Sequence, residues 1–169
     1  PVIASHSSAK AICAAPRNLD DDQIRAVRDN GGVIGVNYEV TFVNEAHRIA
    51  KGAVADEKQE ELKKARKDFE TGSNGLLNVE TEIEEKFKEK LVEVSKPKWE
   101  EIVDHIDHMV AVAGVEHVGL GSDFDGATMP EGMEDCTKVP LITQELLKRG
   151  YTEGDVRKIL GENFMRVMG

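Results

Sequence analysis

Two carboxylates, Asp123 and Asp125, follow a short apolar run at residues 118–122 that reads Val-Gly-Leu-Gly-Ser. A run that is apolar on both faces is typical of a parallel strand covered by helices. Gly121 and Gly126 loosen the backbone there, and α/β proteins place their chemistry at the carboxyl end of such strands. Burying a carboxylate without a partner costs several kcal/mol, so packing alone rarely explains an acid at this position. Two interpretations of Asp123 follow: a catalytic acid or base, or a strand-end residue that caps the loop.

His6 is the one histidine placed to act together with Asp123. It ends an apolar run that starts at Pro1, so both side chains are expected at the same edge of a parallel sheet. Imidazole binds zinc and a carboxylate transfers protons, which suits a metal hydrolase, although other catalytic His/Asp pairs occupy the same place in a fold. His117 opens the third predicted strand and is expected at the opposite edge, where residues usually serve stability.

His105 and His108 are three residues apart in a predicted helix and could share a metal ion. That helix is expected to cover the sheet from outside. We therefore favour pairing of the two histidines with Asp104 and Asp107 or with solvent. His47 lies in the polar segment described below.

The rest of the chain alternates between apolar strands and amphipathic helices. Strands are predicted at residues 1–5, 33–36 and 117–122, and helices at about 20–29, 97–113, 142–149 and 152–168. This alternation predicts an α/β fold with right-handed crossovers and a parallel sheet. Three strands cannot close a barrel, and eight need about 250 residues. The sheet is therefore either open or the last part of a larger barrel.

Residues 39–96 interrupt the alternation. Positive and negative charges nearly balance in this segment, and two narrow apolar stripes flank a predicted turn at residues 71–75. Thr81 and Glu84 have the spacing of a capping box at a helix start. The segment therefore predicts an inserted helical hairpin with solvated charged faces. A lid or a homodimer contact is the alternative.

Composition limits the possible partners. The 169 residues carry a net charge of −10, which argues against nucleic acid and against an anionic membrane surface. No apolar run is long enough to span a bilayer. Cys13 and Cys136 form neither a disulfide framework nor a zinc ribbon, and we expect both to be small hydrophobic side chains. The chain starts without an initiator Met or a signal-peptide layout, so the sequence is expected to be soluble while its compartment, cytoplasmic or periplasmic/extracellular, is left open.

Several motifs together resemble the membrane (renal-type) dipeptidases. They are Pro-Val-Ile-Ala-Ser-His-Ser-Ser at 1–8, Pro-Arg-Asn at 16–18, Asp-His-Ile-Asp-His at 104–108 and Gly-Ser-Asp-Phe-Asp-Gly at 121–126. Residues 130–135 and 145–150 continue the likeness. The motifs occur in the family's order and cover the chain except for the insertion.

The resemblance implies strands six to eight of a (β/α)8 barrel of the amidohydrolase type, in an enzyme that holds two zinc ions and cleaves dipeptides. His6 matches a ligand of the second zinc ion. Arg17 matches the residue that binds the C-terminal carboxylate of the substrate, whereas without the resemblance it would be read as an ordinary surface arginine. Asp123 matches the acid that transfers protons and contacts the substrate.

The other zinc ligands implied by the resemblance precede Pro1, and one imidazole does not make a catalytic zinc site. We therefore expect activity only together with an N-terminal part of the barrel. Two alternatives stay open: a related amidohydrolase acting on N-acyl amino acids or lactones, and a non-catalytic segment, either a truncated barrel or an interaction piece.

Overall fold

A computed structural model describes residues 1–70 and 76–169 of the chain. The predicted turn at 71–75 lies outside the described residues. The chain divides into two compact units, one formed by Pro1–Glu45 and Lys96–Gly169 and the other by Ala46–Ser95. Each is described by itself below.

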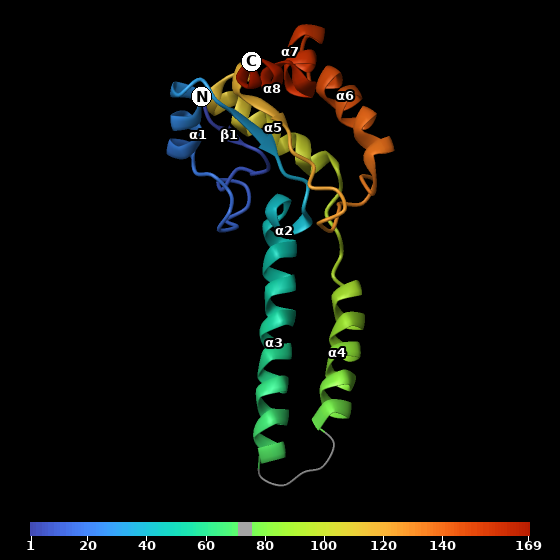
Figure 1. Ribbon diagram of the computed structural model, residues 1–169. Helices are drawn as coiled ribbons and strands as arrows, with labels where there is room; N and C mark the ends of the chain where they lie inside the picture. The colour runs from blue at the N-terminus through green and yellow to red at the C-terminus, as the bar shows by residue number, and fades with distance from the viewer. Residues whose placement is uncertain (71–75) are drawn as a thin grey trace. The chain divides into compact units, whose positions relative to one another are not determined.

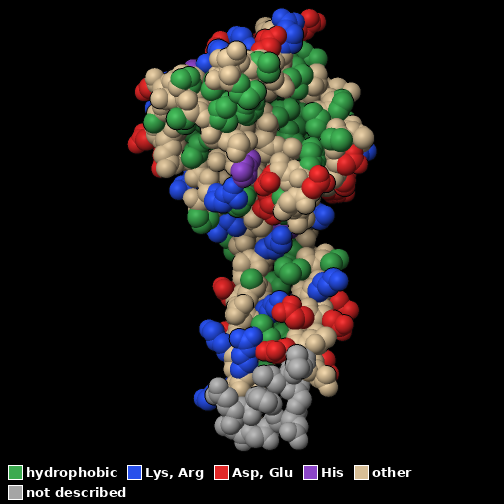
Figure 2. Space-filling model, in the orientation of Figure 1, with side chains coloured by type: hydrophobic (Ala, Val, Ile, Leu, Met, Phe, Trp, Pro, Cys, Tyr) green, Lys and Arg blue, Asp and Glu red, His purple; other side chains and the backbone are tan. Residues whose placement is uncertain are grey.

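The second unit is a pair of long helices, α3 (Glu45–Glu70) and α4 (Leu76–Val92), which run side by side (Figure 1). Their small core consists of Leu62, Ile83 and Phe87. Positive and negative side chains alternate over the surface of this helix pair (Figure 2). Several of them form ion pairs from one helix to the other: Lys58–Glu84, Arg66–Glu80, Lys86–Glu61 and Lys90–Glu57.

The predicted capping box is wrong, because α4 starts at Leu76 and Thr81 lies inside the helix. Glu84, the expected capping partner, instead pairs with Lys58 of α3 at 2.5 Å. Neither α3 nor any other helix in the described ranges combines the length and the apolar character needed to cross a membrane.

The first unit contains a parallel sheet in the order β1 (Ile3–Ala4), β2 (Val33–Val36), β3 (Val118–Leu120). The register pairs Ala4 with Ile34 and Ile34 with Val118. The α/β alternation and the parallel sheet are confirmed, while β1 and β3 are shorter than the runs 1–5 and 117–122. Before β3, residues Val115–His117 form a short 3-10 turn, η1.

The helices of this unit begin and end where local chemistry dictates. Helix α1 (Asp21–Asp29) starts with a capping box in which Asp20 and Gln23 bond each other's backbone, at 2.9 and 3.0 Å. Helix α5 (Glu100–Ala113) ends at Gly114, whose φ of 89° favours glycine. A short α2 (Val40–Val43) follows β2 and precedes the second unit. The C-terminal part comprises η2 (Cys136–Lys138), α6 (Val139–Lys148), α7 (Glu153–Arg157), η3 (Lys158–Glu162) and α8 (Asn163–Met168).

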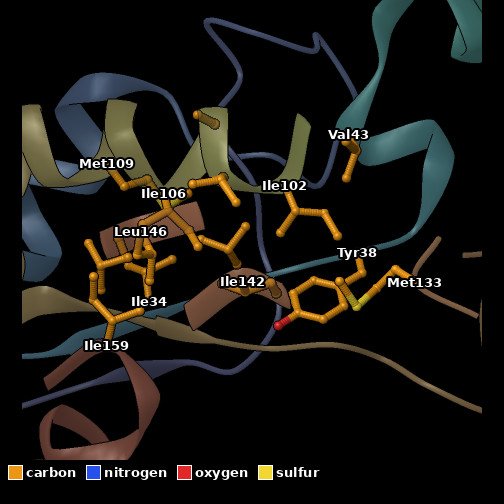
Figure 3. Close-up of a cluster of buried hydrophobic side chains, with 14 of the residues drawn as sticks. Ile34, Tyr38, Val43, Ile102, Ile106, Met109, Met133, Ile142, Leu146 and Ile159 are labelled. Carbon is orange, nitrogen blue, oxygen red and sulfur yellow. The ribbon is translucent and has the colours of Figure 1, made fainter. Parts of the chain in front are cut away.

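One face of the sheet packs against the helices and forms the main core. Ile34 of β2 lies among apolar side chains from α5 and α6, as Figure 3 shows for Ile106, Ile142 and Leu146. Apolar residues of α5 recur with helical spacing and are buried: Ile102, Val103, Ile106, Met109 and Ala113. Val43 of α2 belongs to the same core, so residues 39–45 pack with the first unit.

The other face of the sheet is lined by glycine at Gly35, Gly119 and Gly121. A Cβ at Gly119 would lie 2.4 Å from the ring of Phe164, and one at Gly121 would lie 2.2 Å from the carbonyl oxygen of Ser5. Both approaches are shorter than real Cβ contacts, so this face requires residues without a side chain.

The two cysteines have different environments. Cys13 is buried, as expected for a small hydrophobic residue, whereas Cys136 is exposed at η2. They do not form a disulfide with each other. Cys13 thus fits the expected small hydrophobic side chain, whereas the exposed Cys136 does not pack in the core.

Candidate functional site

The loops that follow the three strands are joined at the carboxyl edge of the sheet. The backbone N–H of Ser7, after β1, donates to the carbonyl of Gly35 at 2.8 Å, and that of Gly121 donates to the carbonyl of Val36 at 2.9 Å. Val40, after β2, donates to the carbonyl of Thr128 in the loop after β3, at 3.0 Å. His6, Arg17 and Asp123 all lie in these loops, so the sheet topology places the predicted site residues at one edge.

His6 and Arg17 are in direct contact. The Arg17 Nη2 lies 2.5 Å from the His6 Nε2, and the Ser5 Oγ lies 2.7 Å from the His6 Nδ1. An arginine nitrogen only donates, so Nε2 accepts and carries no proton. In this arrangement the Nδ1–H donates to the Ser5 Oγ.

The Nε2 lone pair that accepts from Arg17 is the one that a metal ion would use. Catalytic zinc sites take about three protein ligands. Within residues 1–70 and 76–169, no group of three or more His, Cys, Asp or Glu side chains is arranged to hold a metal ion. The described residues therefore do not fit a complete zinc site, and His6 supplies at most one ligand.

Arg17 is exposed, and its guanidinium lies 5.3 Å from the centre of the Phe42 ring. Stacking on an aromatic face restrains the planar guanidinium while leaving donors available to solvent. Such a group can bind a carboxylate through two parallel hydrogen bonds. The next residue, Asn18, is buried, and its side chain bonds to the backbone of the same loop at Cys13.

Asp123 is half-buried in the loop after β3, in a left-handed backbone conformation with φ of 60°. Its Oδ2 accepts a hydrogen bond from the Nδ2 of Asn37 at 3.3 Å. Asp125 also has a positive φ, 68°, and is exposed. Non-glycine residues adopt this conformation uncommonly, and two of them in three positions mark a loop whose shape is imposed by its surroundings.

The loop after β3 is held by an aromatic contact. Phe124, between the two aspartates, packs edge-on against Tyr38, with ring centroids 5.8 Å apart. Tyr38 is fully buried in the core seen in Figure 3, and its hydroxyl has no hydrogen-bond partner among the residues that the structure describes. Burial raises the pKa of this phenol, so it stays protonated.

The structure thus groups the predicted site residues into two pairs, His6 with Arg17 and Asp123 with Asn37. Within the described part of the chain, no hydrogen bond joins one pair to the other. Asn37 received no role from its sequence, although its place directly after a buried strand is the signal that marked His6 and Asp123.

The expected pairing of the histidines on α5 is wrong. His105 is buried: its Nδ1 accepts from the backbone N–H of Ala9 at 2.9 Å, and its Nε2 donates to the carbonyl of Val43 at 2.8 Å. Burial lowers the pKa of this imidazole. His108 bonds to Asp21 at 2.7 Å. The two histidines therefore face different partners and do not form a metal site together.

Asp104 and Asp107, the partners expected for these histidines, bind the guanidinium of Arg149 at 2.7 Å each. This arginine lies near the end of α6, so the acids of α5 serve helix packing. His117 lies at the amino edge of the sheet, where it bonds to the carbonyl of Gly32 at 2.8 Å. That position agrees with the structural role predicted for it.

A surface hollow of about 300 Å³ lies on the helix pair of the second unit, where Lys58 and Phe87 are among its lining residues. His6, Arg17 and Asp123 do not line it. The hollow therefore gives no reason to move the candidate site away from the carboxyl edge of the sheet.

A family model described as membrane dipeptidase (peptidase family M19) matches residues 1–169. The match includes the segments that carry His6, Arg17 and Asp123.

Individual relatives agree with the family match. An uncharacterized protein in the pqqA 5′ region of Klebsiella pneumoniae is 33% identical over 168 residues, covering 99% of this chain and 46% of the relative. The crystal structure of the probable dipeptidase PvdM from Pseudomonas aeruginosa is 29% identical with a TM-score of 0.71, covering 98% of this chain and 44% of that one.

A further solved structure is a metallo peptidase from Rhodobacter sphaeroides, liganded with a phosphinate mimic of the dipeptide L-Ala-D-Ala. It is 29% identical with a TM-score of 0.65, over 97% of this chain and 34% of that one. The chain therefore spans less than half the length of each of these three proteins.

Proposed function

The chain belongs to the membrane dipeptidase family, peptidase family M19, and from this premise we propose that it is part of a zinc-dependent dipeptidase. The observation that carries the proposal is the placement of His6, Arg17 and Asp123 at one edge of a parallel sheet, in a chain that matches the family from end to end. Each of the three has a side chain suited to a separate task.

We propose that β1, β2 and β3 are strands six, seven and eight of a (β/α)8 barrel. The parallel order, the helical crossovers and the chemistry at the carboxyl edge support this arrangement. The remaining strands come from an N-terminal part of the protein, and the helix pair Ala46–Ser95 is an insertion between strands seven and eight. Catalysis requires the N-terminal part, because most of the metal ligands lie there.

Arg17 binds the substrate's terminal carboxylate. Its guanidinium is always charged, offers two parallel donors and is restrained on the Phe42 ring. A carboxylate at that point selects short substrates, because a longer peptide has an amide where the dipeptide has its charge. N-acyl amino acids carry the same carboxylate, so they are the second substrate class to test.

Asp123 transfers the proton of the attacking water toward the leaving amine. Its carboxylate is half-buried and oriented by Asn37, at the edge where the substrate's scissile bond is placed by Arg17. His6 would be one ligand of a two-zinc centre, with its Nδ1–H directed to Ser5. Zinc ions held there would supply Lewis-acid polarisation of the scissile carbonyl.

The proposal is tested with the complete protein, N-terminal part included. Dipeptides, dipeptide amides and N-acyl amino acids are compared as substrates, for the parent and for Arg17→Lys. Lysine keeps the charge but loses the two-pronged contact, so we expect KM for dipeptides to rise at least tenfold, and the amides to be poor substrates for both proteins. Equal cleavage of amides and free acids by the parent would show that Arg17 does not bind a carboxylate.

The metal assignment has its own readout. His6→Ala in the complete protein should lower zinc content, measured by mass spectrometry, together with turnover. Full zinc content in this variant contradicts the ligand role. The 169-residue chain expressed alone should bind no zinc and cleave no dipeptide, and activity in that preparation would refute the need for an N-terminal part.

A further inference from the structure

Three buried polar side chains connect the loops that carry the candidate site. Ser8, Asn18 and Asn37 are each at most 2% exposed, and each lies in a loop after β1 or β2. Burying such groups is unfavourable unless they are hydrogen-bonded, and a fully bonded buried network holds its members rigidly. Their contacts therefore show what they hold in place.

Asn37 has both ends of its side-chain amide occupied. Its Oδ1 accepts from the backbone N–H of Glu39 at 2.6 Å, so its Nδ2 is directed to the carboxylate of Asp123. Its backbone carbonyl accepts from the hydroxyl of Ser8 at 3.1 Å. The orientation of Asp123 is thus set by a residue that the core has already fixed.

Asn18 plays the same part beside Arg17. Its Oδ1 accepts from the backbone N–H of Ser8 at 3.2 Å, and its Nδ2 donates to the carbonyls of Cys13 and Phe42, at 2.8 Å each. Phe42 carries the ring on which the Arg17 guanidinium lies. Asn18 therefore holds both the loop of Arg17 and the aromatic surface beneath it.

We infer that Asn37 and Asn18, joined through Ser8, are positioning residues: Asn37 orients the carboxylate of Asp123, and Asn18 places Arg17 on Phe42. The inference rests on the proposed function, since it assigns proton transfer to Asp123 and carboxylate binding to Arg17. It predicts that substitutions at the two asparagines change different kinetic constants. Changes at Asn37 act on kcat, and changes at Asn18 act on KM.

The chain offers a matched control in Asn163. This asparagine is also 2% exposed, and its Nδ2 donates to the carbonyls of Val115 and Val118, at 2.7 and 2.8 Å. Val115 begins η1 and Val118 is the first residue of β3, so both carbonyls lie toward the end of the strand opposite Asp123. Asn163→Ala removes two hydrogen bonds of a buried asparagine, where Asn18→Ala removes three, and it does not touch the candidate site.

The sharpest variant is Asn37→Asp. It keeps the size of the side chain, the acceptor for Glu39 and the backbone contact with Ser8, and it replaces the donor that faces Asp123 by an oxygen. In the complete protein we expect kcat for dipeptides to fall at least tenfold with KM within threefold. Asn18→Ala should raise KM at least fivefold with a smaller change in kcat, and Asn163→Ala should leave both within twofold when normalised to folded protein.

Parental kcat in Asn37→Asp overturns the inference, and so does an Asn163→Ala variant that reproduces the losses of the other two. Crystal structures of the parent and Asn37→Asp give a readout that does not depend on the substrate. The Asp123 carboxylate should leave its position beside residue 37, and an unmoved carboxylate contradicts the inference. A parent that cleaves no dipeptide, with Asp123 displaced in the variant, refutes the proposed function and leaves the positioning role of Asn37 supported.

Discussion

Each of the two units of this chain is stabilised internally by a different kind of interaction. The unit Pro1–Glu45 with Lys96–Gly169 has a continuous apolar core and buried polar side chains with assigned hydrogen bonds. Among its described residues, the unit Ala46–Ser95 has three buried apolar side chains and a series of ion pairs between α3 and α4 on its surface. Apolar burial is worth about 1.5–3 kcal/mol for a large side chain, whereas an exposed ion pair is worth about 0.2–1 kcal/mol.

This difference indicates which unit can hold side chains in fixed positions. Residues that must act together need rigid support, and the candidate site residues lie in the unit that has a dense core and a buried polar network. The helix pair depends on contacts that salt weakens and that exchange readily with water. Four experiments test whether the two units differ in this way.

The largest effect is expected from Ile106→Ala, in the centre of α5. Ile106 is fully buried against the sheet, so the substitution removes apolar contacts and leaves a cavity, at a cost of about 2–5 kcal/mol. Urea unfolding of the complete protein measures it. Ile49→Ala on α3, where the side chain is 57% exposed, is the control and should stay within about 0.5 kcal/mol. Equal costs at the two positions would remove the contrast between the units.

The second prediction concerns the loss of folding stability at acidic pH. Burial lowers the pKa of His105 below its usual value of about 6.5, so the folded protein disfavours the protonated ring. The stability that this neutral histidine contributes is complete above pH 6.5 or so, and it is lost as the pH falls from there toward the folded-state pKa. The slope due to one group is at most about 1.4 kcal/mol per pH unit. The free energy of unfolding of His105→Gln should therefore fall less steeply than that of the parent in this range; identical slopes would exclude His105 as the acid-sensitive group of the first unit.

A smaller effect is expected at the ion pairs of the helix pair. Lys58→Gln and Lys90→Gln remove the partners of Glu84 and Glu57, and each should cost about 0.2–1 kcal/mol at low salt. At 1 M salt the Debye length is about 3 Å, so most of this difference should disappear. Hydrogen exchange of the α3 and α4 amides provides the measurement, with the α5 amides as the internal control. A loss that persists at high salt would indicate packing rather than charge.

The smallest effect is expected when the helix pair is removed. The Nδ1 of His47 lies 2.8 Å from the carbonyl oxygen of Ser95, so the two ends of the second unit are close and a short Gly-Ser linker can replace Ala46–Ser95. Because His6, Arg17 and Asp123 belong to the other unit, we expect kcat/KM of the complete protein to stay within about threefold. A larger loss would favour the alternative that the insertion is a lid or a dimer contact, and gel filtration would separate these two.

Much of the first unit could be predicted from local patterns. The apolar runs located the three strands of this unit, and the helices predicted at about 20–29 and 97–113 overlap α1 and α5, because strand burial and helix capping depend on neighbouring residues. Parallel pairing then placed His6 and Asp123 at one edge and His117 at the other. These predictions needed only the order of the elements.

Two of the errors share a physical origin. Thr81 and Glu84 have the spacing of a capping box, yet Glu84 pairs with Lys58 on the facing helix. Asp104 and Asp107 lie next to histidines in sequence, yet they bind Arg149 more than 40 residues away, at separations of 45 and 42 positions. In each case a partner distant in sequence replaced the local one.

Periodicity and strand direction can be read from the sequence alone, so the α/β alternation and the sheet edge that holds the candidate site residues could be predicted without the structure. Only the tertiary structure decided that Asn37 faces Asp123 from 86 positions away and that Asn18 supports the ring beneath Arg17. No local sequence pattern distinguishes an asparagine or serine that is solvated in a loop from one that is buried and hydrogen-bonded. Their role depends on which distant backbone groups the packed core brings within hydrogen-bond distance.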